Sequence, residues 1–142
     1  MVKIGVIGYG YWGPNLVRNF AEIQGLTVAC VADLDPKKLE IVQKRYPGIN
    51  TTTDFQEMIN DPAIDAIAIA TPVSTHFELG MAALKAGKHL WLEKPMTETS
   101  AEARQLVEEA EKRKLVLIVD HTFVYTGAVR KIADIIKSGD LE

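Results

Sequence analysis

The sequence of 142 residues has a single cysteine, Cys30, and only three histidines. One cysteine cannot form an internal disulfide, and no Cys/His group has the spacing of a zinc site. We therefore expect no metal site and no disulfide framework, and a cytoplasmic location. Cys30 lies within an apolar run, where burial as a small apolar side chain is its expected role.

Long apolar runs and a large excess of one charge are also missing. No run approaches the ~20 residues that span a bilayer, and the N-terminus lacks the layout of a signal peptide. The net charge of −3 argues against a general nucleic-acid or membrane binder. No serine nucleophile elbow is present, and no glycine-rich turn ends in the Lys-Ser/Thr of a phosphate-binding NTPase loop. The hydrophobic content of 47% is that of an ordinary soluble domain.

The strongest pattern lies in the first thirty-three residues. An apolar run at residues 2–7 leads into the turn Gly8-Tyr9-Gly10-Tyr11-Trp12-Gly13, and a second run at 26–32 ends at Asp33. This order predicts strand, glycine-rich turn, helix, strand and acid. It is typical of a βαβ unit that binds a dinucleotide such as NAD.

Each part of the motif has a chemical role in that interpretation. Gly8 allows the tight turn, Gly10 lets the backbone approach a pyrophosphate, and Gly13 lets the helix lie close to the sheet. The pyrophosphate would lie at the helix N-terminus, and Asp33 would accept hydrogen bonds from the ribose hydroxyls. The alternative is a packing turn with Asp33 as a helix cap, but two closely spaced glycines are a costly choice for packing alone.

Short apolar runs alternate with helical patterns over the rest of the chain. Strands are expected at 2–7, 26–32, 66–70, 89–92 and 115–119, with a short one within 51–53. Asp35 is expected to cap a helix that has Pro36 in its first turn. Capping boxes are expected at Thr53/Gln56, Thr75/Glu78 and Thr99/Glu102. Ile23 and Val107 are expected to face the core. The alternation predicts an α/β fold, a doubly wound parallel sheet, as one dinucleotide-binding domain over residues 1–142.

A last amphipathic pattern comes from Val129, Ile132, Ala133 and Ile136, which repeat at helical spacing. Gly139 is expected to end this helix.

Most residues that could bind a ligand or take part in catalysis follow predicted strands. They should therefore gather at the carboxyl edge of the sheet. Lys94, after the strand at 89–92, could orient a substrate hydroxyl and lower its pKa. Glu93 could pair with Lys94 or contact the nicotinamide ribose. The alternative for both is a solvated charge pair. His76 could face the cofactor or bond to nearby backbone, and His121 could line a substrate pocket or belong to an ordinary loop.

These residues carry a resemblance to a known family. The chain is similar to the glucose–fructose oxidoreductase/inositol dehydrogenase family, Gfo/Idh/MocA, in its turn at 8–13, in Asp33, and in Ala70-Thr71-Pro72 followed by His76. The segment 86–95, ending in Glu93-Lys94-Pro95, is the most specific match. Residues 12–15 and 121–125 look most like members that act on nucleotide-linked sugars.

The resemblance implies an NAD(P)-dependent oxidoreductase acting on a sugar, cyclitol or sugar nucleotide. It implies that Lys94 takes part in catalysis, and that a second domain supplies a histidine acid/base, most substrate contacts and often an oligomer interface. The sequence stops where that C-terminal substrate domain should begin. Residues 138–141 resemble the junction, and Leu141-Glu142 resembles a cloning scar. We expect an excised cofactor domain rather than a natural stand-alone one, binding NAD without appreciable turnover.

Three functions therefore compete: the nucleotide half of a sugar dehydrogenase, a stand-alone NAD-sensing module, and a Rossmann domain for another ligand such as S-adenosylmethionine. The Glu93-Lys94-Pro95 segment favours the first. We expect NAD over NADP because Asp33 would repel a 2′-phosphate, although Lys37 and Lys38 could soften that preference. The expected cofactor-binding residues are Gly8, Gly10, Tyr11, Trp12, Gly13, Asp33, Leu34, Ala70, Thr71, Pro72, His76, Glu93 and Lys94.

Overall fold

The computed structural model describes residues 1–139 and shows a six-stranded, wholly parallel sheet in the order β3-β2-β1-β4-β5-β6. This is the strand order of a dinucleotide-binding doubly wound fold, so the predicted fold class is confirmed. The strands are β1 (Val2–Ile7), β2 (Leu26–Ala32), β3 (Asn50–Thr52), β4 (Ala66–Ile69), β5 (His89–Leu92) and β6 (Leu117–Val119). The helices are α1 (Gly13–Glu22), α2 (Pro36–Arg45), α3 (Phe55–Asn60), α4 (His76–Lys85), α5 (Ser100–Arg113) and α6 (Gly127–Ser138), with short turns η1 (Val73–Thr75) and η2 (Thr122–Tyr125).

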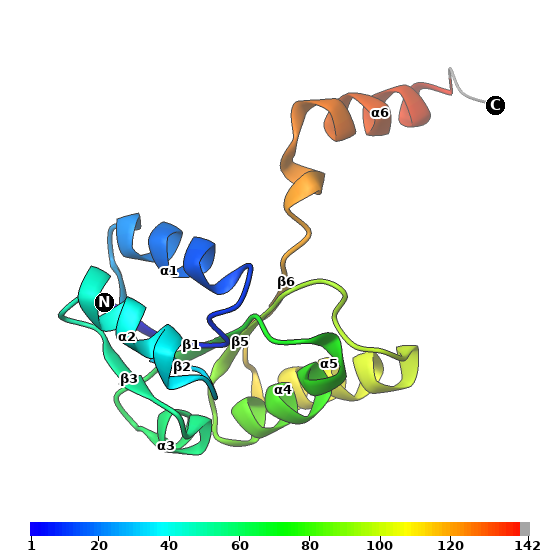
Figure 1. The fold of residues 1–142 in the computed structure, drawn as a ribbon. Coiled ribbons are helices and arrows are strands. Elements are labelled where there is room, and N and C mark those ends of the chain that lie inside the picture. The colour runs from blue at the N-terminus through cyan, green and yellow to red at the C-terminus, as the bar shows by residue number, and fades with distance from the viewer. Residues whose placement is uncertain (140–142) are drawn as a thin grey trace.

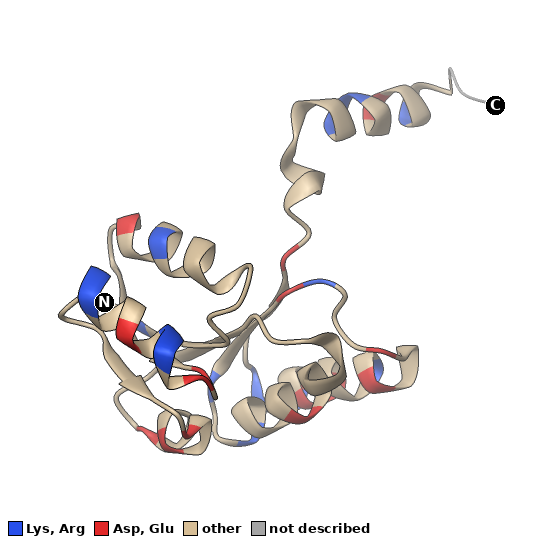
Figure 2. Cartoon of the chain, viewed as in Figure 1, with Lys and Arg blue, Asp and Glu red and all other residues tan. Residues whose placement is uncertain are grey.

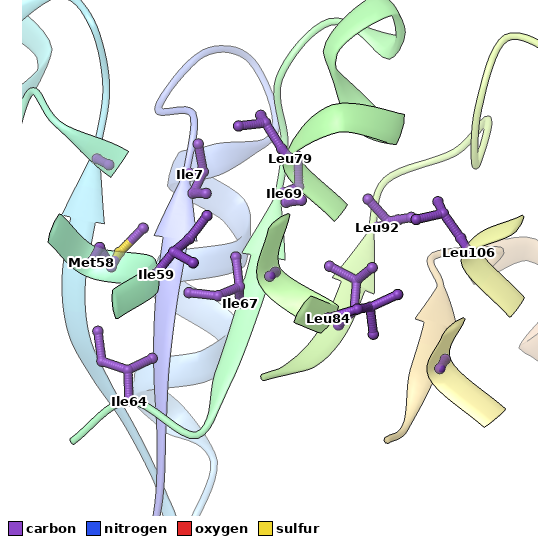
Figure 3. Close-up of a cluster of buried hydrophobic side chains, with 14 residues drawn as sticks. Ile7, Met58, Ile59, Ile64, Ile67, Ile69, Leu79, Leu84, Leu92 and Leu106 are labelled. Atoms are coloured by element: carbon purple, nitrogen blue, oxygen red, sulfur yellow. The ribbon is translucent and has the colours of Figure 1, made fainter. Parts of the chain in front are cut away.

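Helices cover both faces of the sheet (Figure 1). α1 and α2 pack on one face, where Leu16, Phe20 and Val42 belong to one buried cluster. α3, α4 and α5 pack on the other face, where the larger buried cluster lies (Figure 3). Acidic and basic residues are interspersed along α1, α2 and α6, whereas the charged residues around α3 are acidic (Figure 2).

The central strand β4 is a continuous apolar run because both of its faces are covered. Ile67 and Ile69 are fully buried among α3, α4 and α5, while Ala68 is fully buried on the α1 side. A parallel strand covered by helices on both faces has no solvent side, so no polar alternation is expected. The small alanine on the α1 side leaves room for that helix to lie close to the sheet.

Several helix starts follow the predicted chemistry and others do not. Asp35 caps α2 by accepting from the Lys37 amide, and Thr99 and Glu102 form the expected capping box of α5. The box expected at Thr53 is wrong: the neighbouring Asp54 caps α3, because its carboxylate reaches the Gln56 amide. The box at Thr75 is also wrong, since its hydroxyl bonds to Thr71 and to the Pro72 carbonyl instead.

Two residues expected in the core are exposed. Ile23 caps the C-terminus of α1 in an extended conformation, so its side chain leaves the buried stripe. Val107 lies at the edge of the α5 stripe, of which Leu106 and Ala110 are buried. The last strand begins at Leu117 rather than at 115.

α6 forms as predicted and ends at Gly139, whose φ is +79°. Unlike the other helices it projects from the carboxyl edge of the sheet (Figure 1) and packs chiefly against η2. Within residues 1–139, no helix has the length and apolar character needed to cross a membrane. The expected junction at 138–141 and the Leu141-Glu142 scar lie wholly or partly outside the described residues.

Candidate functional site

The carboxyl ends of four neighbouring strands place the predicted residues along one edge. Gly8 follows β1, Asp33 follows β2, Ala70 follows β4 and Glu93 follows β5. Between β1 and β4 the connections leave toward opposite faces of the sheet, with α1 on one and α3 to α5 on the other. Such a switch point is where open α/β sheets bind ligands.

The glycine-rich turn shows two different demands for glycine. Gly8 has a φ of +95°, and a Cβ there would lie 2.8 Å from the Ala70 carbonyl oxygen. A Cβ on Gly13 would collide with the Gly8 carbonyl, so both glycines are needed for packing. Gly10 differs, because a Cβ there would meet no atom within 4 Å. The turn therefore leaves open space at Gly10, where a ligand could approach the backbone.

The start of α1 suits an anion. Trp12 is its N-cap without a side-chain hydrogen bond, and the first turn carries no acidic residue. No carboxylate of that turn therefore competes with a ligand phosphate for the positive end of the helix dipole.

Asp33 is held firmly at the end of β2. Its Oδ2 accepts from the Tyr9 amide at 2.7 Å, and its Oδ1 accepts from the Asp35 amide at 2.9 Å. Partial burial raises the pKa of this carboxyl, but the Asp35 and Tyr9 amides and the Lys38 ammonium outweigh burial and hold the pKa below its ordinary value. A fixed carboxylate is therefore present beside the glycine turn at neutral pH.

Lys38 contacts this carboxylate directly. Its Nζ lies 3.2 Å from both oxygens of Asp33, reaching back from the first turn of α2. The lysine side chain is 39% exposed and that of Asp33 is 9% exposed, so the carboxylate is the more buried partner of the pair. A ribose hydroxyl approaching Asp33 would share the carboxylate with Lys38.

His76 contacts both the segment after β4 and the segment after β5. Its Nε2 lies 2.9 Å from the Thr71 carbonyl oxygen and its Nδ1 lies 3.0 Å from the Pro95 carbonyl oxygen. The residue is 1% exposed. This geometry favours the backbone-bonding alternative, in which His76 braces the segment after β4 against the segment after β5.

The segment after β5 contains a buried acid, Glu93, next to an exposed lysine, Lys94. Lys94 extends toward the glycine turn, with its Nζ 6.0 Å from the centre of the Trp12 ring, and a cis peptide bond joins it to Pro95. Glu93 is only 5% exposed. Burial, together with the neighbouring Asp120 carboxyl, raises the pKa of Glu93 to about 6.

Other predicted residues lie at the rim. Leu34 and Tyr11 are each 84% exposed, Trp12 is 43% exposed, and His121 is exposed at the start of the chain that leads to α6. No group of three His, Cys, Asp or Glu side chains within residues 1–139 is placed to hold a metal ion. Sequence reasoning did not identify Asp120 as a partner of Glu93. The signal was available, because both residues directly follow neighbouring strands.

Comparison with known proteins agrees with this geometry. Residues 2–121 match a family model described as an oxidoreductase family with an NAD-binding Rossmann fold, Gfo/Idh/MocA. The chain is 30% identical over 141 residues to scyllo-inositol 2-dehydrogenase (NADP(+)) of Bacillus subtilis, covering 99% of this chain and 39% of that protein. It is 34% identical over 128 residues to D-xylose 1-dehydrogenase (NADP(+)) of Hypocrea jecorina, covering 88% of this chain and 33% of that protein.

Solved structures give the same result. Biliverdin reductase from Synechocystis, in complex with biliverdin and NADP+, aligns with a TM-score of 0.88 at 27% identity, over 96% of this chain and 43% of that one. The chain thus spans less than half the length of the proteins it matches. The family model, the strand order and the glycine turn all agree that the chain belongs to the Gfo/Idh/MocA oxidoreductase family and carries its NAD(P)-binding Rossmann domain.

Proposed function

We propose that this chain is the cofactor-binding part of a dehydrogenase that moves a hydride between a nicotinamide and a CH–OH group of a sugar, cyclitol or sugar nucleotide. The observation that carries the proposal is the fixed Asp33 carboxylate next to a glycine turn that is open at Gly10. The names of the inositol and xylose dehydrogenases support the substrate class.

Different residues along the edge would hold different parts of the dinucleotide. Asp33, with Leu34 at the rim, would hold the adenosine ribose. The turn from Gly8 to Gly13 and the start of α1 would hold the pyrophosphate. Ala70, Thr71, Pro72, Glu93 and Lys94 would line the nicotinamide half. His76 would keep the two segments of that half at a fixed separation through its two backbone contacts.

The bound cofactor would supply the hydride acceptor or donor, and Lys94 would supply the charge. Its ammonium can donate a hydrogen bond to the substrate oxygen, which lowers the pKa of the hydroxyl and stabilises the developing negative charge. Hydride transfer also requires a substrate that is held against the nicotinamide with water excluded. We assign those tasks, and the acceptance of the hydroxyl proton by a histidine, to a second, C-terminal domain, so the 142 residues alone should bind the cofactor without appreciable turnover.

Cofactor choice is the first test of the proposal. A 2′-phosphate would meet the Asp33 carboxylate, so NAD+ should bind more tightly than NADP+, with Lys38 reducing the difference. In calorimetric titrations, Asp33→Ala should weaken NAD+ binding by about tenfold or more, the loss expected for hydrogen bonds to a charged group. NADP+ binding should change much less.

Asp35→Ser is the matched control. It removes a charge two residues away but keeps a side-chain oxygen to cap α2. Tighter NADP+ than NAD+ binding in the unaltered chain would refute the assigned role of Asp33. Binding of neither cofactor would refute the proposed function.

Lys94 provides the second test. Lys94→Ala should change NAD+ affinity by no more than about threefold, since an exposed charged contact contributes little. In a longer protein that contains both domains, the same change should lower kcat far more than it raises the cofactor Kd. Equal losses in both would reduce Lys94 to a binding residue.

A further inference from the structure

Glu93 and Asp120 form a pair of carboxyl groups that the proposed hydride transfer does not use. Leu92 of β5 and Val119 of β6 are register partners, so Glu93 and Asp120 are the next pair beyond the strands. The Asp120 amide donates to the Leu92 carbonyl at 2.8 Å, and the Glu93 amide donates to the Ile69 carbonyl at 3.0 Å. Backbone hydrogen bonds therefore hold both residues against the edge of the sheet.

The environment of Glu93 is unusual for an ionised acid. The residue is 5% exposed, and its Oε1 has no hydrogen-bond partner among the described residues. A buried carboxylate oxygen without a donor is costly, and a second carboxylate beside it adds repulsion. One proton between the two groups removes both problems, because a carboxyl O–H can donate to a carboxylate.

We propose that Glu93 and Asp120 share one proton at the nicotinamide end of the site and thereby make the preference for oxidised over reduced cofactor depend on pH. The inference rests on the proposed function, which places the nicotinamide ring beside the segment after β5. An oxidised nicotinamide ring carries a positive charge and a reduced ring does not. The charge state of the pair therefore acts on one form of the cofactor and not on the other.

The direction follows from the charges around the pair. The described charged groups that act on Glu93 are Asp120, from the end of β6, and Lys94, from its own turn. With the proton bound, the three groups carry no net charge; without it, they carry one negative charge. Raising the pH should therefore strengthen NAD+ binding relative to NADH, and by linkage bound NAD+ should release the proton. Burial and Asp120 raise the pKa of Glu93 to about 6, which places the change just below neutral pH.

The test compares NAD+, NADH and ADP-ribose binding to the 142-residue chain between pH 5 and 8. The ratio of the NADH Kd to the NAD+ Kd should rise with pH by up to about fivefold, the upper range for a solvent-screened ion pair. ADP-ribose lacks the nicotinamide and should not follow this pH dependence. Glu93→Gln should flatten the ratio, and Asp120→Asn should move its midpoint to lower pH, because the repelling neighbour is lost.

A second measurement does not depend on the cofactor. Carboxyl ¹³C NMR of the free chain should show Glu93 losing its proton near pH 6, and at a lower pH in Asp120→Asn. A ratio that is flat in pH, or unchanged in Asp120→Asn, would overturn the proposal while cofactor binding itself stands. Failure of all three ligands to bind would refute the proposed function instead, and the NMR titration would then decide whether the pair shares a proton.

Discussion

α5 and α6 begin from the same kind of sequence and end in different surroundings. Both are amphipathic helices predicted from apolar residues at helical spacing. In α5, Leu106 is completely buried against the sheet and α4. In α6, Ile132 and Ile136 remain 51% and 58% exposed, and the helix has no buried residue. Periodicity thus predicts that a helix forms and which side is apolar, but it does not name the surface that covers that side.

The largest expected effect comes from truncating equivalent apolar residues in the two helices. Leu106→Ala should lower the free energy of unfolding by about 3 kcal/mol, because it removes buried contacts and leaves a cavity. Ile132→Ala, on the exposed stripe of α6, should change it by less than about 0.5 kcal/mol. Urea denaturation with unchanged m-values would measure both.

The comparison fails if Ile132→Ala is as costly as Leu106→Ala. That result would mean that α6 packs against the body of the molecule in solution, or against a second copy. Repeating the Ile132→Ala measurement at several protein concentrations separates these outcomes, since only association makes the effect concentration-dependent.

The sequence predicted the body of the fold well because local and long-range signals agree there. The apolar run of β4 has helices on both faces, and Asp35 and Thr99 cap the helices where expected. Errors arose where two polar residues compete for one role, as when Asp54 rather than Thr53 caps α3. Ile23 was misplaced because the helix ends before it.

The site was predictable at the level of the strand ends but not of the side-chain contacts. Motif spacing placed Asp33 and Lys94 at one edge, because parallel strands bring their carboxyl ends together. The bracing contacts of His76 with the Thr71 and Pro95 carbonyls depend on how two loops fold toward each other. His76 and Pro95 are 19 residues apart, and no periodic pattern in the sequence indicates that they come into contact.

Replacing an acid should change the pH dependence of stability when the acid lies in the body of the domain, residues 1–120, but not when it lies on α6. The raised pKa of Glu93, about 6 against an ordinary 4.5, means that the folded chain binds this proton more readily than the unfolded chain. The ionised form therefore destabilises the fold, fully above pH 6 and progressively less toward pH 4.5. Glu93→Gln should be more stable than the unaltered chain at pH 8 by about 1–2 kcal/mol, and equal to it near pH 4.5.

Asp134→Asn is the control for this prediction, because Asp134 is an exposed acid on α6. Its unfolding free energy should follow that of the unaltered chain across the same range. Comparing each variant with the unaltered chain at every pH cancels the opposite contribution of Asp33, whose lowered pKa stabilises the fold at neutral pH and ceases to do so in acid. A stability gain for Glu93→Gln that is constant from pH 4.5 to 8 would show that burial of the side chain, and not its charge, is the cost.

The smallest expected effect on stability comes from replacing the threonine that precedes each of the two helices. Thr99 caps α5 through its side chain, within a reciprocal capping box with Glu102, whereas Thr126 precedes α6 without a side-chain cap and donates its hydroxyl to the Phe123 carbonyl. Thr99→Ala should cost about 1 kcal/mol of global stability, and Thr99→Ser should restore most of it, because the serine hydroxyl can form the same bonds. Thr126→Ala should leave the global transition within about 0.3 kcal/mol and act only on α6, since opening a helix that buries nothing against the sheet is a local event. Hydrogen exchange distinguishes the two cases: faster exchange confined to α6 supports the comparison, and faster exchange throughout the sheet would show that α6 and the body unfold as one unit.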